Sequence, residues 1–286
     1  MTLRKLFKKA VSSDTLRFQG QAWILALIVS FIPVQVSGAE EVVTATPNRP
    51  GVGDTTDITQ KGILEVEYGW ERGFRSAEFK TLTALSGLIR FGLAQDVGLR
   101  LGMDNYLSQR SDDPQGRRSG VGDISLGFKV RLLKQDELRP ALAFAYDIKV
   151  PNASRKKGLG SGRVDHNLLL VAGKEILEME WDLTYLVGWI GKESRKDFDD
   201  LHLWALSFSR PLFGPLGISG EIYGSPRLNL ETPGFVSTDW ALTYAVTHRV
   251  VFDAGVDIGL VSAASDVTYF AGVTIALVDL YRLLSP

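Results

Sequence analysis

Residues 119–133, "SGVGDISLGFKVRLL", alternate between apolar residues and small or charged ones. Successive side chains of a β-strand point to opposite faces, so this segment has one apolar face and one polar face. The apolar face carries Ile124, Leu126, Phe128, Val130 and Leu132, and the polar face carries Asp123, Ser125, Gly127, Lys129 and Arg131. A soluble sandwich rarely keeps this pattern along most of its length, whereas a membrane barrel faces lipid on one side and a polar lumen on the other. Lysine or arginine facing lipid costs about 2–4 kcal/mol at the midplane, so we expect Lys129 and Arg131 to face a lumen.

The composition sets broad limits on the class of protein. The chain has 286 residues, no cysteine, three histidines and a formal net charge of −1. These values allow one large domain and exclude a disulfide framework or a cysteine-ligated metal site. No basic stretch indicates a nucleic-acid partner, and we expect neither a metal nor a cofactor.

The amino terminus has the features of a secretory signal peptide. Several lysines and arginines precede a largely apolar run at 22–32, and the small residues Ser37 and Ala39 have the spacing of a cleavage site. The run is shorter than the roughly 20 residues that a membrane-spanning helix needs, although an uncleaved anchor is the alternative. We therefore expect a signal peptide at 1–39, a polar segment at 40–62 and a barrel at 63–286. The polar segment either folds into the barrel as a plug or remains a periplasmic tail.

Twelve segments after residue 62 have the alternation of membrane-spanning β-strands. Most carry apolar residues on one face and small or charged residues on the other. The predicted strands are 63–72, 79–92, 96–106, 122–133, 140–150, 164–176, 180–190, 200–209, 216–224, 235–246, 250–260 and 266–278. An even number of strands about ten residues long is typical of bacterial outer-membrane barrels. The sequence predicts an all-β, antiparallel, up-and-down transmembrane β-barrel of about 12 strands.

The connections between these segments give a separate indication. Four of the six connections on one side are longer than any connection on the other side. Outer-membrane barrels have long external loops and short periplasmic turns, so the first strand is expected to run outward. Aromatic residues are expected to form a belt at the outer interface. They are Trp70, Phe79, Tyr106, Trp189, Phe198, Tyr223 and Phe235.

Two predicted strands do not alternate cleanly. Segments 164–176 and 200–209 have apolar residues on both faces near their centres. A β-bulge, a strand tilt or an apolar patch inside the lumen would each explain this pattern.

The polar faces of the predicted strands supply the candidate lumen residues. We expect ten of them to line the lumen: Arg100, Asp104, Asp123, Lys129, Arg131, Asp147, Lys149, Asp182, Asp253 and Asp257. Five further acidic candidates are Glu65, Glu67, Glu180, Glu221 and Asp239. Cross-strand ion pairs among these residues would satisfy buried charge, and the same residues could select solutes.

Several phrases resemble the bacterial family of MetA-pathway of phenol degradation transporters. They are "NRPGVGDTTDITQKGILEVEYGWE" at 48–71, "GVGDISLGFKVRLL" at 120–133 and "RPALAFAYDIKVP" at 139–151. The first phrase contains the motif Arg49, Pro50 and Gly51 before the first strand. The resemblance implies an outer-membrane channel.

One departure concerns the end of the barrel, where the family pattern finishes on an aromatic residue. Here the chain continues as "DLYRLLSP", so either Tyr281 replaces that aromatic or the end lies beyond the pattern.

These features predict a channel in the outer membrane of a Gram-negative bacterium that passes small, hydrophobic or aromatic solutes by passive diffusion. A barrel of 12 strands is intermediate in width between small filled barrels and 16-stranded porins. The expected partners are the solute, outer-membrane lipid, lipopolysaccharide and the barrel-assembly machinery. The cationic loop segments 115–120 and 154–157 are candidates for contact with lipopolysaccharide phosphates.

Two other function classes are weighed against the channel. One is a structural or interaction barrel of the outer membrane. The other is a lipid-acting enzyme, for which His166 and His202 are the candidate bases. No G-x-S-x-G motif accompanies either histidine, so we expect the protein not to be an enzyme.

Overall fold

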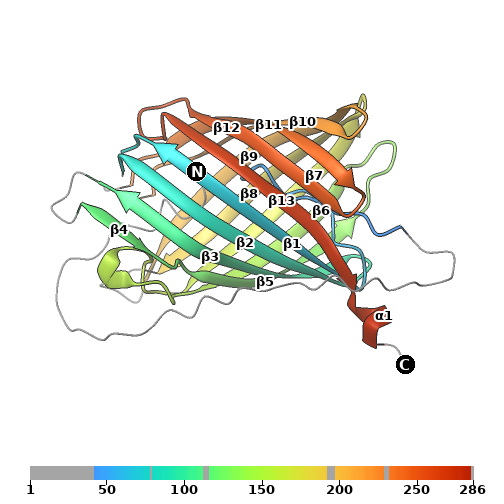
Figure 1. Cartoon of the computed structure of the whole chain (residues 1–286), viewed down its shortest axis with the longest axis horizontal. Helices are drawn as coiled ribbons and strands as arrows, with labels where there is room; N and C mark the ends of the chain where they lie inside the picture. Colours follow the sequence, from blue (N-terminus) through green and yellow to red (C-terminus); the bar gives the residue numbers. More distant parts are fainter. Residues whose placement is uncertain (1–41, 78, 112–115, 192–196, 229–231, 285–286) are drawn as a thin grey trace.

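The β-strands form one closed antiparallel sheet, as the computed structural model in Figure 1 shows. The structure describes residues 42–77, 79–111, 116–191, 197–228 and 232–284, so the predicted signal peptide lies outside the described residues. The strands are β1 (Ile63–Phe74), β2 (Thr81–Ala94), β3 (Val97–Arg110), β4 (Arg117–Gly120), β5 (Ile124–Leu133), β6 (Ala141–Val150), β7 (Asp165–Ile176), β8 (Met179–Gly191), β9 (Phe198–Phe213), β10 (Leu216–Ser225), β11 (Phe235–Thr247), β12 (Val250–Gly259) and β13 (Val267–Asp279). Strand β1 pairs with both β2 and β13, and this pairing closes a barrel of 12 strands. The predicted fold class is confirmed.

The additional strand β4 was not predicted. Strands β4 and β5 pair with different halves of β3, and the chain is interrupted between them at 121–123, so the predicted strand 122–133 begins at Ile124. At the interruption the Gly122 N–H donates to the Asp104 carbonyl at 2.7 Å. A Cβ on Gly122 would lie only 2.3 Å from the Asp104 Cβ, so this close approach requires glycine. The four-residue strand "RRSG" has too little alternation to be recognised from sequence.

The connections differ in length at the two ends of the barrel. Four turns at one end have two residues each, at 95–96, 177–178, 214–215 and 248–249. Leu177 and Glu178 both have positive φ, as a tight hairpin with a mirror-image turn requires. Strand β9 continues to Phe213, so most of the turn predicted at 210–215 is strand. The opposite end carries β4 and the 3-10 helix η2 (Arg155–Lys157), and it is the extracellular end.

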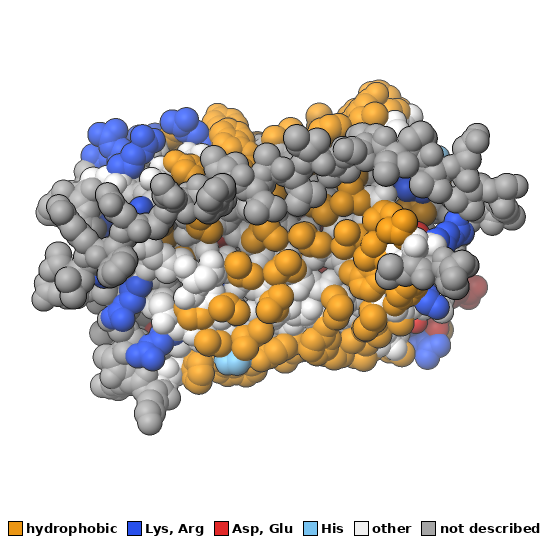
Figure 2. All heavy atoms as spheres, turned by 60° about the horizontal axis from the view of Figure 1, so that its bottom comes forward, with side chains coloured by type: hydrophobic (Ala, Val, Ile, Leu, Met, Phe, Trp, Pro, Cys, Tyr) orange, Lys and Arg blue, Asp and Glu red, His pale blue; other side chains and the backbone are white. Residues whose placement is uncertain are grey.

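The outer surface of the barrel is apolar and its inner surface is polar. Figure 2 shows hydrophobic side chains over the middle of the wall, with lysine and arginine gathered toward the two ends. In β5, Leu126 and Leu132 are 49% and 58% exposed, whereas Lys129 between them is 5% exposed. The alternation of residues 119–133 therefore separates a lipid-facing surface from the barrel interior, as predicted.

The predicted aromatic belt is correct only in part. Trp70, Tyr106 and Trp189 are exposed on the outer surface. Tyr223, in contrast, is fully buried inside the barrel, where its hydroxyl donates to Asp257. Phe235 packs against the Tyr223 ring at 6.0 Å between centroids. Phe79 is also buried, so position near a strand end alone did not decide which face an aromatic residue takes.

An apolar patch inside the barrel explains the two strands without clean alternation. Leu169 of β7 and Leu201 and Leu203 of β9 are buried on the inner face, while Leu170 and Trp204 are exposed on the outer face. The β7–β8 and β8–β9 ladders have no register shift, so no bulge is needed there. The patch also contains Ala145, Leu186, Ile190, Ala205, Tyr223, Phe235 and Ala264.

The last strand is followed by a short helix, α1 (Leu280–Leu284), at the end with the two-residue turns. The Tyr281 hydroxyl donates to the Leu93 carbonyl at 2.7 Å, and its ring contacts Phe91 edge to face at 5.6 Å. An aromatic residue therefore lies at the end of the barrel in spite of the continued chain. Among the described residues no helix is long and apolar enough to cross a membrane.

Candidate functional site

The charged residues of the barrel interior are divided between two sides of the wall. Strands β2, β3, β5 and β6 carry the inner-facing cations, which are Arg90, Arg100, Lys129, Arg131 and Lys149. On β8 and β10 to β12 the inner-facing charges described are acidic: Glu180, Asp182, Glu221, Asp239, Asp253 and Asp257. The cationic strands also carry the inner-facing carboxylates Asp104 and Asp147, but cations outnumber them there. The lumen therefore has a more cationic side and an acidic side, and a segment that crosses it meets both.

Residues 42–62 enter the barrel from its rim, where Val42 is exposed, and contact wall strands that are far apart in the sheet. The Thr46 N–H donates to Glu65 of β1 at 2.7 Å. The N–H groups of Val52 and Gly53 donate to the two carboxylate oxygens of Glu221 on β10, at 2.6 and 2.7 Å. Because four pairings separate β1 from β10 in the sheet, this segment, which we name the lumen segment, extends across the interior.

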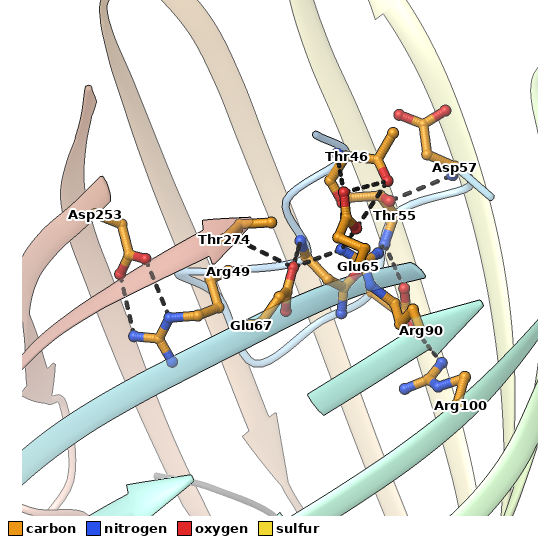
Figure 3. Close-up of polar contacts among 12 residues, drawn as sticks. Thr46, Arg49, Thr55, Asp57, Glu65, Glu67, Arg90, Arg100, Asp253 and Thr274 are labelled. Carbon is orange, nitrogen blue, oxygen red and sulfur yellow. Dashed lines mark hydrogen bonds and ion pairs between the residues drawn. The ribbon is translucent and has the colours of Figure 1, made fainter. Parts of the chain in front are cut away.

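Arg49 attaches the lumen segment to the acidic side. Its Nε and Nη2 atoms donate to the two oxygens of Asp253 at 3.1 and 3.0 Å (Figure 3). The guanidinium lies directly over Gly69 and Gly272, where an added Cβ would come within 2.0 and 2.3 Å of its atoms. Both positions must be glycine for Arg49 to lie there. The peptide bond from Arg49 to Pro50 is cis.

Asp54 attaches the same segment to the cationic side. Its Oδ1 accepts from Lys129 Nζ at 2.6 Å, and its Oδ2 accepts from Arg100. Arg100 Nε also lies 3.5 Å from Asp147. The Thr184 hydroxyl accepts the Asp54 N–H and donates to the Asp54 carbonyl, both at 2.9 Å. Burial would raise the pKa of Asp54, but the charges and hydrogen bonds of Lys129 and Arg100 outweigh it and hold that pKa well below its usual range.

Arg90 forms a third charged cluster that was not predicted. It donates to Glu65, to the Thr46 carbonyl and, at 2.6 Å, to Glu67. Arg90 is the only charged residue of β2, so the cost of placing arginine in lipid could have assigned it to the lumen. Asp54 was also missed, because the irregular segment that contains it has no periodicity from which a face can be assigned.

The structure brings some of the ten predicted lumen residues together. Lys149 lies 3.2 Å from Asp123 and forms a second ion pair with Asp165. Arg131 pairs at 2.8 Å with Asp96, which lies in the two-residue turn between β2 and β3. Lys129 and Arg100 share Asp54, while Asp147 contacts Arg100 and Asp253 contacts Arg49. Asp104, Asp182 and Asp257 are also buried; the Asp104 N–H donates to the carbonyl of Asp123 at 3.3 Å, and Asp257 accepts from the Tyr223 hydroxyl.

Cavities lie on both faces of the lumen segment. A cavity of about 620 Å³ on the periplasmic face is lined by Asp182, Glu221 and many residues of β9 to β11. A smaller cavity of about 140 Å³ on the extracellular face is lined by residues of β1, β12 and β13. Arg49, Pro50 and Gly51 line both cavities. The predicted motif therefore lies at the point where the lumen segment separates the two spaces.

The two histidines considered as catalytic bases have tyrosine partners. The Nδ1 atom of His166 lies 2.6 Å from the Tyr146 hydroxyl, and that of His202 lies 2.8 Å from the Tyr185 hydroxyl. Both pairs are on the outer face, because the neighbouring residues Asp165, Leu201 and Leu203 are buried inside. Within the described part of the chain, no group of three or more His, Asp or Glu residues could hold a metal ion.

A closed 12-stranded barrel with an apolar exterior and a charged interior is an outer-membrane β-barrel, and this architecture places the protein in the outer membrane of a Gram-negative bacterium. The chain belongs to the family described as "Putative MetA-pathway of phenol degradation", whose model matches residues 47–277. The predicted family resemblance is confirmed. The match includes most of the lumen segment as well as the barrel.

Outer-membrane channels and porins are among the solved structures with a similar fold. An outer membrane channel from Pseudomonas putida F1 is 14% identical, with a TM-score of 0.59, and the match covers 85% of this chain and 100% of that one. The NanC porin is 10% identical, with a TM-score of 0.50 and coverage of 75% and 100%. The KdgM porin in complex with disordered oligogalacturonate is 11% identical, with a TM-score of 0.50 and coverage of 75% and 99%. No protein of curated function matches the chain in sequence.

Proposed function

We propose that the protein is a passive outer-membrane channel for small, hydrophobic or aromatic solutes, and that its lumen segment forms the constriction. The observation that carries this proposal is that Arg49, Pro50 and Gly51 line cavities on both faces of the segment. The similarity to channels and porins and the family assignment support the same reading. The candidate histidines favour a channel over a lipid-acting enzyme, because the described hydrogen-bond partner of each ring is a tyrosine hydroxyl and not the serine or carboxylate of a hydrolase.

The way the lumen segment is attached to the wall supports a constriction that can open when the segment leaves the wall. Its described contacts with the wall are mainly hydrogen bonds and ion pairs to carboxylates and cations. It joins the sheet at one isolated bridge, between Lys61 and Gly92. Displacing residues 42–58 therefore breaks no strand ladder of the barrel. These contacts support a plug in preference to a periplasmic tail.

Deleting residues 42–58 is expected to raise single-channel conductance in planar bilayers several-fold, because the deletion joins the two cavities. The full-length mature chain, refolded in parallel, is the reference. Heat-modifiable migration on gels would verify that both forms are folded barrels. A deletion form that is folded but as silent as the full-length chain would contradict the channel and would favour a structural or interaction barrel.

The extracellular end supports contact with lipopolysaccharide phosphates. The loop after β6 packs against β4, because Leu159 is buried against Leu107 and Lys157 Nζ donates to the Ser119 carbonyl at 3.1 Å. This packing places η2 beside the arginines of β4, and the exposed cations Arg117 and Lys156 lie on these two elements. Barrel-assembly machinery is a further proposed partner, because closing the barrel joins β1 to β13 across the whole chain.

Reversing charge at this end, with Arg117→Glu and Lys156→Glu together, is expected to reduce the amount of bound lipopolysaccharide about tenfold. Each lost charge-assisted contact to phosphate costs about 1 kcal/mol or more. The measurement is binding of purified lipopolysaccharide to the protein in detergent at two salt concentrations. The matched control is Lys134→Glu with Arg139→Glu at the periplasmic end. Equal binding by both double variants would contradict the contact.

A further inference from the structure

We infer that Val52 and Asp54 occupy the place of a solute, and that the channel binds small carboxylates with an apolar body through Arg100 and Lys129. This inference rests on the proposed channel function and names the solute class of the same lumen. The two residues present an apolar group and a carboxylate only two positions apart in the chain. A released lumen segment would vacate both contacts at once.

The cationic half of this site is held by the barrel wall. Arg100 and Lys129 extend from the paired strands β3 and β5, and their side chains are 13% and 6% exposed. Asp54 bridges them with one oxygen to each cation. Asp147, on the next strand, lies 3.5 Å from Arg100 and gives that guanidinium a second carboxylate contact that belongs to the wall. The arrangement is a two-cation receptor for one carboxylate.

The apolar half is the inner apolar patch, which extends from β6 to β11. Val52 packs against this cluster, which includes Leu186, Leu203 and Tyr223. An apolar ring or branched chain that replaces Val52 would keep the same surface away from water. The patch and the two cations are therefore complementary to the two ends of one small amphiphilic acid.

Charge on the opposite wall sets the orientation of such a solute. Glu221 and Asp239 lie side by side on β10 and β11 and face the lumen. They repel a carboxylate, whereas Arg100 and Lys129 attract it. Release of the lumen segment would leave these buried cations without the carboxylate of Asp54, so an incoming carboxylate restores a lost partner. The solute and Asp54 are therefore competitors for one place.

The test compares Asp54→Asn with Asp253→Asn. Both variants remove one carboxylate that attaches the lumen segment, and both raise the net charge of the lumen by the same amount. Only Asp54→Asn removes the carboxylate from Arg100 and Lys129. Each variant is studied in planar bilayers in potassium chloride with one added compound. Benzoate supplies the carboxylate and the apolar ring together, acetate supplies the carboxylate alone, and benzyl alcohol supplies the apolar ring alone.

Benzoate is expected to reduce the potassium chloride conductance of Asp54→Asn in a saturable manner, at a concentration about tenfold lower than acetate requires. Benzyl alcohol is expected to have no saturable effect. Asp253→Asn is expected to need about tenfold more benzoate than Asp54→Asn, because its two-cation site is still occupied. The form lacking residues 42–58 exposes the same cations and provides the same test if Asp54→Asn does not fold.

Two results would overturn the inference in distinguishable ways. Equal benzoate sensitivity of the two variants would show that net charge alone matters, and the inference would fail while the channel remained. A folded barrel that is silent in the wild-type, Asp54→Asn and deletion forms would remove the proposed function itself.

Discussion

Arg90→Met is expected to lower the free energy of unfolding by about 3–5 kcal/mol, because it leaves two buried carboxylates without the cation that pairs with them. Glu65 and Glu67 are 0% and 3% exposed, and Arg90 contacts both of them. Methionine keeps much of the side-chain length, so lost packing contributes little. Urea unfolding in detergent micelles, followed by heat-modifiable gel migration, measures the change.

The same cluster supplies its own controls. Arg90→Lys retains a positive charge near Glu65 and Glu67 and is expected to lose less stability than Arg90→Met. The triple variant Arg90→Met, Glu65→Gln and Glu67→Gln removes the carboxylates with the cation and is expected to recover part of the loss. Equal destabilisation of the single and triple variants would mean that the volume of Arg90, and not its charge, stabilises the wall.

Strand alternation predicted the barrel because a spanning strand must satisfy lipid on one face and the lumen on the other. Lys129 illustrates this, since its position between Phe128 and Val130 is enough to direct it inward. Tyr223 illustrates the limit, because an aromatic residue is compatible with either face. Its burial depends on Asp257 and Phe235, which are distant in sequence.

The lumen segment could not be placed from sequence for a related reason. It has neither strand alternation nor helical periodicity, and its contacts join residues far apart, such as Arg49 with Asp253. The resemblance at residues 48–71 drew attention to Arg49, Pro50 and Gly51 without giving them a location. The glycines that accommodate Arg49, Gly69 and Gly272, read simply as small residues of a polar face. Only the three-dimensional arrangement shows that these two glycines leave room for the Arg49 guanidinium.

Gly69→Ala is expected to open the channel without changing any charge. A Cβ at this position would lie 2.0 Å from an Arg49 nitrogen, and the three nearest atoms are all in the Arg49 guanidinium. That side chain would have to leave Asp253, at a cost of about 2 kcal/mol for its charge-assisted hydrogen bonds. A change of this size shifts the ratio of released to attached lumen segment roughly thirtyfold. Single-channel recording would show it as a larger fraction of time in the high-conductance state.

Gly98→Ala is the matched control, because its Cβ would meet the lumen segment only at Ile58, at an ordinary 3.5 Å. Both variants add one methyl group to the inner wall, so a general narrowing of the lumen would affect them alike. A narrowing effect would also lower the conductance, whereas release of Arg49 raises it. The sign of the change in Gly69→Ala therefore separates a wall residue that merely lines the path from one that holds the constriction in place. An unchanged open fraction in Gly69→Ala would contradict the role of Arg49 as an attachment point.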